Sequence, residues 1–166
     1  MVTRASKDEG RTFAIAPARG AAEIEIVRAL FREYAAFLGE AVCLPGYEEE
    51  IASLPGVYAP PKGEIMLARD AKGAVLGCLA LKPLPDGAGE LKRLYVREAG
   101  RGLGLGRALT LAIEEVARRA GYRELRLDTL PRLTQAVTLY RSLGYQDAAR
   151  YNDNPNAGVI FFAKKL

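Results

Sequence analysis

The chain has 166 residues, 49% of them hydrophobic and 27% charged, as is typical of one soluble domain with its own core. It has no histidine and only two cysteines, which excludes Ser-His-Asp and Cys-His catalysis, histidine-ligated zinc and a disulfide framework. The net charge of +4 is too small to indicate a nucleic-acid-binding surface, and no apolar run is long enough to span a membrane. We therefore expect a cytoplasmic protein with no metal, nucleic-acid or membrane partner.

The N-terminal part of the chain predicts a strand followed by a long helix. Residues 1–10 are charged and polar, as in a flexible tail, so the folded domain is expected over 11–166. A first strand is predicted at 11–18. Apolar residues then recur every 3.6 residues from Ala21 until Gly39 ends the pattern, which is typical of an amphipathic helix.

The middle of the chain predicts a short helix and three strands. The helix is expected at 46–56, ahead of a proline-rich loop. Strands at 64–70 and 74–83 flank the turn "DAKG", which is a hairpin signal. A third strand, "ELKRLYV" at 90–96, follows a second loop rich in proline and glycine.

The C-terminal half alternates between helices and strands. Apolar periodicity predicts helices at 105–120 and 133–143, with a strand between them at 123–130. Residues 145–151 and 157–166 are expected to form a final hairpin around "NDNPN". The resulting order, β-α-α-β-β-β-α-β-α-β-β, predicts an α/β (α+β) fold in one domain, with a mixed sheet of about seven strands and helices on both faces.

The stretch "REAGRGLGLGRAL" at 97–109 holds four glycines in seven residues and leads directly into a helix. Its spacing fits neither the phosphate loop of nucleotide hydrolases nor the dinucleotide-binding pattern G-x-G-x-x-G. The first amides of a helix lack internal acceptors and lie at the positive end of its dipole, so such a loop suits a diphosphate. The alternative is a flexible loop before an ordinary helix.

The loop resembles the acetyl-CoA-binding signature Q/R-x-x-G-x-G/A of the GNAT N-acetyltransferase superfamily. Arg101, Gly104 and Gly106 stand at its fixed positions. The segments "ELKRLYV", "LRLDT" and "AVTLYRSLGY" follow the family's order, so the resemblance covers most of the chain. It implies a GNAT-type fold and an enzyme that transfers an acetyl group from acetyl-CoA directly to a primary amine.

The resemblance also implies where the cofactor binds. Backbone amides of the glycine loop would hold the CoA pyrophosphate, and the preceding strand would pair with pantetheine as with an added strand. An amide near Leu94 would polarise the thioester carbonyl. The cofactor-binding residues implied in this way are Leu94, Tyr95, Val96, Arg101, Gly102, Leu103, Gly104, Leu105, Gly106 and Arg107.

Tyr140 matches the family tyrosine near the CoA sulfur and would protonate the leaving thiolate. The alternative is a core aromatic, because Tyr140 shares helical spacing with Val137 and Leu143. Many family members carry an asparagine where this chain has Leu133. Thr134 or Gln135 would then have to replace its contact with the cofactor.

Glu90 stands where some family members place the base that deprotonates the amine, and Asp128 and Glu64 are weaker candidates. The alternative for Glu90 is an exposed carboxylate paired with Lys92 or Arg93. In a regular strand the side chains of Glu90, Lys92, Leu94 and Val96 would lie on the same face of the sheet. A bulge, which is common in this strand of the family, would switch the facing midway.

The acceptor is expected to be a small molecule with a primary amine, bound by the first helices and the last hairpin. Tyr34, Tyr151 and Asn154 are the predicted contacts, although asparagines also simply favour tight turns. Cys78 is expected to be a small core residue rather than an acyl carrier. Two other functions stay open: an acyl-CoA sensor without catalysis, and an acetyltransferase acting on a protein amine. Whether the chain forms a homodimer is also left open.

Overall fold

The computed structural model describes residues 12–166, so the tail expected at 1–10 lies outside it. Within that range the strands are β1 (Phe13–Pro17), β2 (Glu64–Asp70), β3 (Val75–Pro83), β4 (Gly89–Val96), β5 (Glu124–Thr129), β6 (Gln146–Asp147) and β7 (Ile160–Lys165). The helices are α1 (Gly20–Leu38), α2 (Tyr47–Ala52), α3 (Leu105–Arg119) and α4 (Thr134–Ser142), with short 3-10 turns η1 (Gly56–Tyr58) and η2 (Glu98–Gly100). The predicted order of strands and helices is confirmed. None of these helices is long and apolar enough to cross a lipid bilayer.

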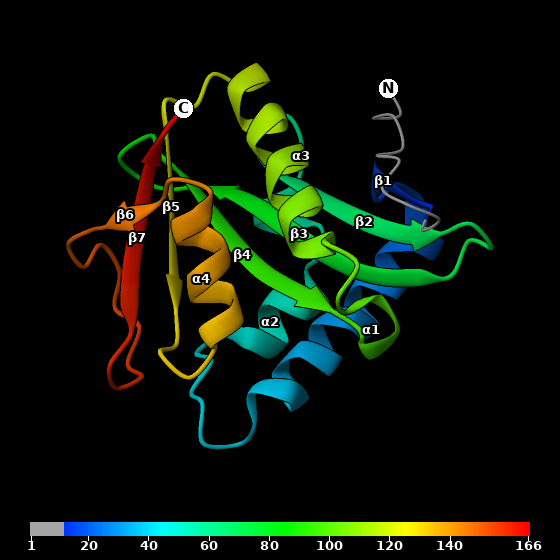
Figure 1. The fold of residues 1–166 in the computed structure, drawn as a ribbon, viewed down its shortest axis with the longest axis horizontal. Coiled ribbons are helices and arrows are strands. Elements are labelled where there is room, and N and C mark those ends of the chain that lie inside the picture. Colours follow the sequence, from blue (N-terminus) through cyan, green and yellow to red (C-terminus); the bar gives the residue numbers. More distant parts are fainter. Residues whose placement is uncertain (1–11) are drawn as a thin grey trace.

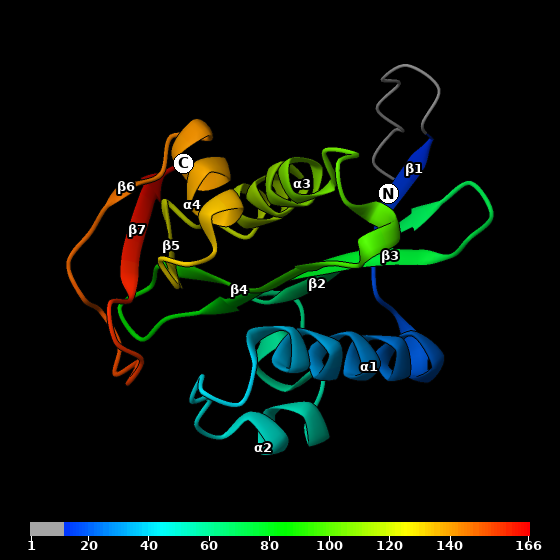
Figure 2. The same ribbon diagram turned by 60° about the horizontal axis from the view of Figure 1, so that its bottom comes forward.

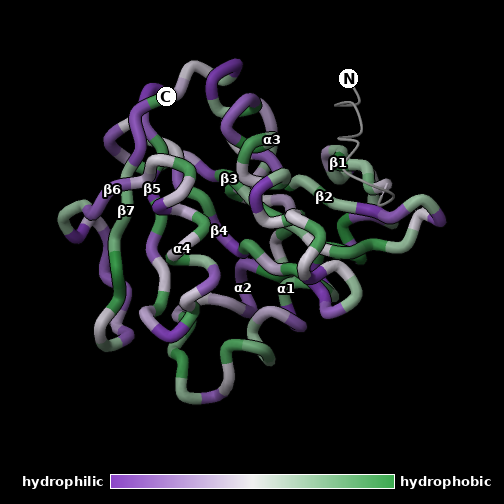
Figure 3. The backbone as a smooth tube through the Cα atoms, viewed as in Figure 1, coloured by the Kyte–Doolittle hydropathy of each residue, from purple (hydrophilic) through white to green (hydrophobic). Residues whose placement is uncertain are grey.

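The described strands form one seven-stranded sheet in the order β1-β2-β3-β4-β5-β7-β6 (Figure 1). Helices α1 and α2 cover one face, and α3 and α4 cover the other (Figure 2). The central strand β3 alternates between two cores: Leu79 and Leu81 pack toward α3, and Cys78 and Ala80 pack toward α1. Most residues of β3 are accordingly hydrophobic (Figure 3). Cys78 is fully buried, which confirms its expected place in the core.

A bulge interrupts β4 in its middle. Cys78 of β3 lies opposite Tyr95 and Ala80 lies opposite Lys92, so two residues of β4 face one residue of β3. Arg93 occupies the bulge with a φ of 65°, a value that residues with a side chain rarely adopt. Past this point Leu94 packs toward α3, whereas Tyr95 packs toward α1. The expected switch in facing is confirmed.

Strands β4 and β5 run parallel but pair only at their first residues. Gly89 lies opposite Leu125 and Glu90 lies opposite Arg126, and beyond this point the strands diverge (Figure 1). The second half of β4 therefore presents an edge toward β5 with no strand beside it. A ligand with amide groups can pair with such an edge.

The predicted final hairpin is confirmed, because β6 pairs antiparallel with β7, but its first strand is much shorter than expected. The strand expected at 145–151 is limited to β6, and the chain leaves the sheet after the Ala148 amide donates to the Phe161 carbonyl, 2.8 Å away. Asparagine side chains then accept hydrogen bonds from backbone amides two residues ahead, at Asn152 and Asn154. Such turns favour irregular backbone over a strand. The segment 149–159 becomes a long loop instead.

Candidate active site

The glycine loop delivers an uncapped helix start to the surface. Gly102 and Gly104 have φ values of 74° and 75°, in the left-handed region that favours glycine. Gly104 is the N-cap of α3 and has no side chain to accept hydrogen bonds from the first amides. A Cβ at Gly104 would meet no atom within 4 Å, so the space before these amides is open. The arrangement suits an anion.

A cavity of about 580 Å³ lies before this helix start, and we call it the donor cavity. The second half of β4, the glycine loop and the start of α4 form its walls. Of the cofactor-binding residues expected from the sequence, it is lined by Leu94, Tyr95, Val96, Arg101, Gly102, Gly104, Leu105, Gly106 and Arg107. Leu103 is not on the lining and packs against the core instead. Thr134 and Gln135 both line the cavity, where they can replace the missing asparagine.

A smaller cavity of about 50 Å³, here called the transfer cavity, continues from the donor cavity. Tyr34, Leu94, Leu133 and Ala136 line both cavities, and Tyr140 lines the smaller one. Tyr140 is only 5% exposed, and its hydroxyl forms no hydrogen bond with another residue of the described chain. Burial raises the pKa of Tyr140 above its ordinary value, so the phenol keeps its proton.

Two carboxylates lie close together near the transfer cavity: Asp128 lines it, and Glu90 lines the neighbouring cavity described below. Glu90 is only 2% exposed, contrary to the alternative of an exposed strand end. The Asn152 Nδ2 atom donates to Asp128 Oδ2 at 2.6 Å and to Glu90 Oε2 at 3.3 Å. Lys82 Nζ and Lys92 Nζ lie 3.7 and 3.9 Å from Glu90 Oε1. One amide thus joins two carboxylates, and two ammonium groups flank one of them.

A third cavity of about 300 Å³, the acceptor cavity, opens beyond these carboxylates. It shares Tyr34, Asp128 and Lys92 with the transfer cavity, and Asn154 lies on its wall. The loop before α2 and the loop 149–159 enclose it from two sides. Asn156 joins these loops, because its side-chain amide accepts from the Cys43 amide and donates to the Cys43 carbonyl, both at 2.8 Å.

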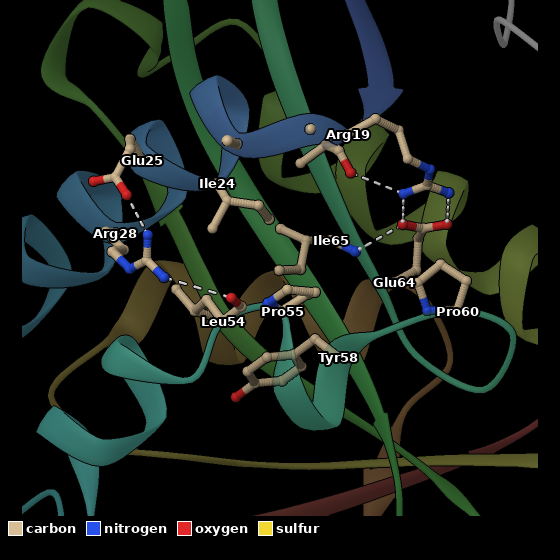
Figure 4. Close-up of a pocket in the computed structure, with 13 residues that line it drawn as sticks. Arg19, Ile24, Glu25, Arg28, Leu54, Pro55, Tyr58, Pro60, Glu64 and Ile65 are labelled. Atoms are coloured by element: carbon tan, nitrogen blue, oxygen red, sulfur yellow. Dashed lines mark hydrogen bonds and ion pairs between the residues drawn. The ribbon is translucent and has the colours of Figure 1, made fainter.

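Besides Leu103, two residues considered from the sequence, Glu64 and Tyr151, lie outside the three cavities. Both carboxylate oxygens of Glu64 accept hydrogen bonds from Arg19, at 2.7 and 2.8 Å, beside a separate cavity of about 400 Å³ (Figure 4). Tyr151 packs its ring edge-on against Phe161, with centroids 5.4 Å apart, and its buried hydroxyl forms no hydrogen bond in the described chain. Burial, and then the negative charge of Glu90, raises the pKa of Tyr151.

Sequence reasoning missed the polar network behind the carboxylates. Lys82 lies opposite Glu90 in the β3–β4 register, a neighbour that correct pairing of the two predicted strands would have revealed. Arg93 forms two hydrogen bonds to Glu50, both at 3.0 Å, and lies over the Tyr47 ring. The bulge and helix α2 are thereby joined by a half-buried ion pair, which no local pattern indicates.

A helix start that suits an anion, a small central cavity and a third cavity that shares lining residues with it are the features expected of a group transferase that brings two substrates together. The model of the Acetyltransferase (GNAT) family matches residues 27–145. An uncharacterised N-acetyltransferase of Schizosaccharomyces pombe is 35% identical over 145 residues, which cover 87% of this chain and 89% of that protein.

Solved structures agree with this match. A GCN5-related N-acetyltransferase from Kribbella flavida is 25% identical with a TM-score of 0.72, covering 93% of this chain and 98% of its own. A GNAT acetyltransferase from Elizabethkingia anophelis, determined with acetyl-CoA bound, has a TM-score of 0.66 at 20% identity, with the same coverage. The chain belongs to the GNAT family of acetyltransferases, as its glycine loop indicated.

Proposed function

We propose that the protein transfers an acetyl group from acetyl-CoA to the primary amine of a small molecule. The observation that carries the proposal is the continuity of the three cavities. The donor cavity ends at an uncapped helix start, and the acceptor cavity begins at two carboxylates. Tyr34 lines all three cavities, so a donor in one and an acceptor in another would meet in the transfer cavity.

The donor end of the line suits acetyl-CoA. The pyrophosphate would accept hydrogen bonds from the first amides of α3, with Arg101 and Arg107 nearby. Pantetheine amides would pair with the free edge of β4, which β5 leaves open past Glu90. The Leu94 amide would then face the thioester carbonyl and stabilise its developing negative charge. The acetyl-CoA in the similar structure from Elizabethkingia anophelis supports this choice of donor.

The chemistry at the centre requires two proton movements. The amine attacks the thioester carbonyl, the C–S bond breaks, and the products are an amide and CoA thiol. We assign removal of the ammonium proton to Asp128, because its carboxylate lines both the transfer and the acceptor cavities. Glu90 helps to position Asp128, because the Asn152 side chain donates hydrogen bonds to both carboxylates. Tyr140 donates a proton to the leaving thiolate. The proposed base is therefore Asp128 and not Glu90, which the sequence favoured.

The shape of the acceptor cavity favours a small molecule over a protein chain. Its volume of about 300 Å³ is at the lower limit of typical ligand pockets. The loops on its two sides are held together by the Asn156–Cys43 pairing, which narrows the space between them that an extended peptide would need.

The test has two parts. Calorimetry should detect binding of acetyl-CoA, and release of CoA thiol should follow when a panel of small amines is added. Asp128→Asn should lower kcat about 100-fold or more, with smaller losses for Glu90→Gln, while the affinity for acetyl-CoA stays the same. Absence of acetyl-CoA binding would refute the proposal. Binding without acetylation of any amine would favour the acyl-CoA sensor, and acetylation of peptide amines alone would favour a protein acceptor.

A further inference from the structure

The charges around the acceptor cavity are unevenly compensated. Lys82 and Lys92 bring two positive charges to the single carboxylate of Glu90, and both approach the same oxygen. Their side chains are 29% and 17% exposed. Over residues 12–166 neither ammonium finds a hydrogen-bond acceptor within 3.5 Å, since each contact with Glu90 is longer. One positive charge and several N–H donors are therefore left facing the cavity.

The neighbouring carboxylate has the opposite imbalance. Asp128 accepts a hydrogen bond from the neutral amide of Asn152. No lysine or arginine in the described part of the chain lies within 4.0 Å of it. One negative charge therefore remains uncompensated on the side of the cavity next to the transfer cavity.

The other charged groups of the lining do not cancel these two. The guanidinium of Arg93 is held by both oxygens of Glu50, so its charge is already neutralised. Asp153 is exposed, so water screens its charge. The lining of the acceptor cavity thus carries one uncompensated positive charge and one uncompensated negative charge.

We infer that the acceptor is a small zwitterion, a primary amine that also carries a carboxylate, as a free amino acid does. The inference rests on the proposed function and names its substrate class. The ammonium group binds at Asp128, next to the thioester, and the carboxylate binds at Lys82, which lines the acceptor cavity and not the transfer cavity. A carboxylate fits better than a phosphate, because the lysines exceed Glu90 by a single charge.

The remainder of the cavity suggests the rest of the molecule. Its walls include apolar side chains from the end of α1 and its following loop, and from the segments after β3 and β5. These are Leu38, Val42, Leu44, Leu84 and Leu130. An aliphatic or aromatic side group would bury its surface there, so leucine and phenylalanine are suitable probes.

The experiment compares each amino acid with the amine that lacks its carboxylate. Leucine is paired with 3-methylbutylamine and phenylalanine with 2-phenylethylamine, and kcat/KM is expressed per concentration of unprotonated amine, because removal of the carboxylate changes the pKa of the amine. We expect the wild type to favour the amino acids about 10- to 100-fold, the range of one charge-assisted contact.

Variants at Lys82 test the position of the carboxylate. Lys82→Met should bring the ratio of kcat/KM values close to one, and Lys82→Arg should retain the preference. Lys72→Met removes an exposed lysine of the β2–β3 turn and should leave the ratio unchanged. Because both acceptors are measured with the same preparation, the ratio does not depend on the folded fraction.

Three results would overturn the inference alone. Equal kcat/KM values of the wild type for the amino acids and for the amines without a carboxylate would refute it and leave the proposed function standing. An unchanged ratio in Lys82→Met would do the same. If neither series were acetylated while other amines of the panel were, the inference would fail and the proposed function would stand. If acetyl-CoA bound and no amine of the panel were acetylated, the proposed function would fail and this inference with it.

Discussion

Gly104 offers the sharpest test of the donor site, because substitution there by aspartate and by asparagine gives two variants that differ in charge and share a shape. Gly104→Asp places a carboxylate before the first amides of α3, in space where a Cβ meets no atom within 4 Å. The φ of 75° costs a side chain about 1 kcal/mol, but aspartate and asparagine tolerate this region better than most residues. Gly104→Asn therefore carries the same backbone cost and no charge, and serves as the matched control.

The difference between the two variants follows from Coulomb's law. A carboxylate about 5 Å from one pyrophosphate charge, at an effective dielectric constant of about 20 to 40, raises the binding free energy by about 2–3 kcal/mol. That corresponds to an affinity for acetyl-CoA about 30- to 150-fold weaker in Gly104→Asp than in Gly104→Asn. The gap should narrow as salt rises, since the cavity is open to solvent.

Isothermal titration of both variants with acetyl-CoA, at low and at high salt, measures this gap directly. Thermal unfolding of the free proteins should give similar midpoints, which shows that the backbone cost is shared. Equal affinities of the two variants for acetyl-CoA would mean that no phosphate binds before α3. The assignment of the loop to the pyrophosphate would then be refuted.

Three further outcomes are expected. Tyr140→Phe should lower kcat about tenfold with little change in the KM for acetyl-CoA, and an unchanged kcat would remove the phenol from the reaction. Because burial raises the pKa of Tyr140 above its usual value of about 10, the wild-type rate should not fall between about pH 8 and 10 through loss of this proton. A thiol reagent at pH 8 should modify the exposed Cys43 and leave Cys78 intact, because burial raises the pKa of the Cys78 thiol to about 12. Modification of both thiols in the folded protein would contradict this prediction. Glu50→Gln should lower the free energy of unfolding in urea by about 2–4 kcal/mol, because it leaves the half-buried charge of Arg93 without a carboxylate partner. A loss below about 1 kcal/mol would show that water already solvates that charge.

Local patterns predicted most of the elements because each signal lies within one element. The stripe from Leu105 onward, the turn at "DAKG" and the glycine loop all report structure within about fifteen residues. The order of strands in the sheet is a different matter, since β5 lies between β4 and β7 through contacts that no periodicity records. The sequence analysis predicted the order of elements along the chain, and the order of strands across the sheet came only from the structure.

The candidate site could be predicted only where it follows the chain. Leu94–Val96 and the glycine loop are contiguous segments, and they line the donor cavity as expected. Asn152 meets Asp128 and Glu90 across 24 and 62 residues, and it does so because the chain leaves the sheet after β6. The asparagines at 152–156 correctly predicted a turn. No local pattern shows which distant residues the side chains of that turn contact.

The bulge at Arg93 connects the stability of the fold to the geometry of the site. Without it, strict alternation would turn Leu94 to the same face as Glu90 and Lys92. With it, Glu90 and Lys92 line the acceptor cavity while Leu94 lines the donor cavity on the other side of the transfer point. The left-handed backbone at Arg93 costs about 1 kcal/mol or more, and its paired contact with Glu50 on α2 holds it in place. One strand can contribute to both cavities because the Arg93–Glu50 ion pair stabilises a backbone conformation that the strand alone would not adopt.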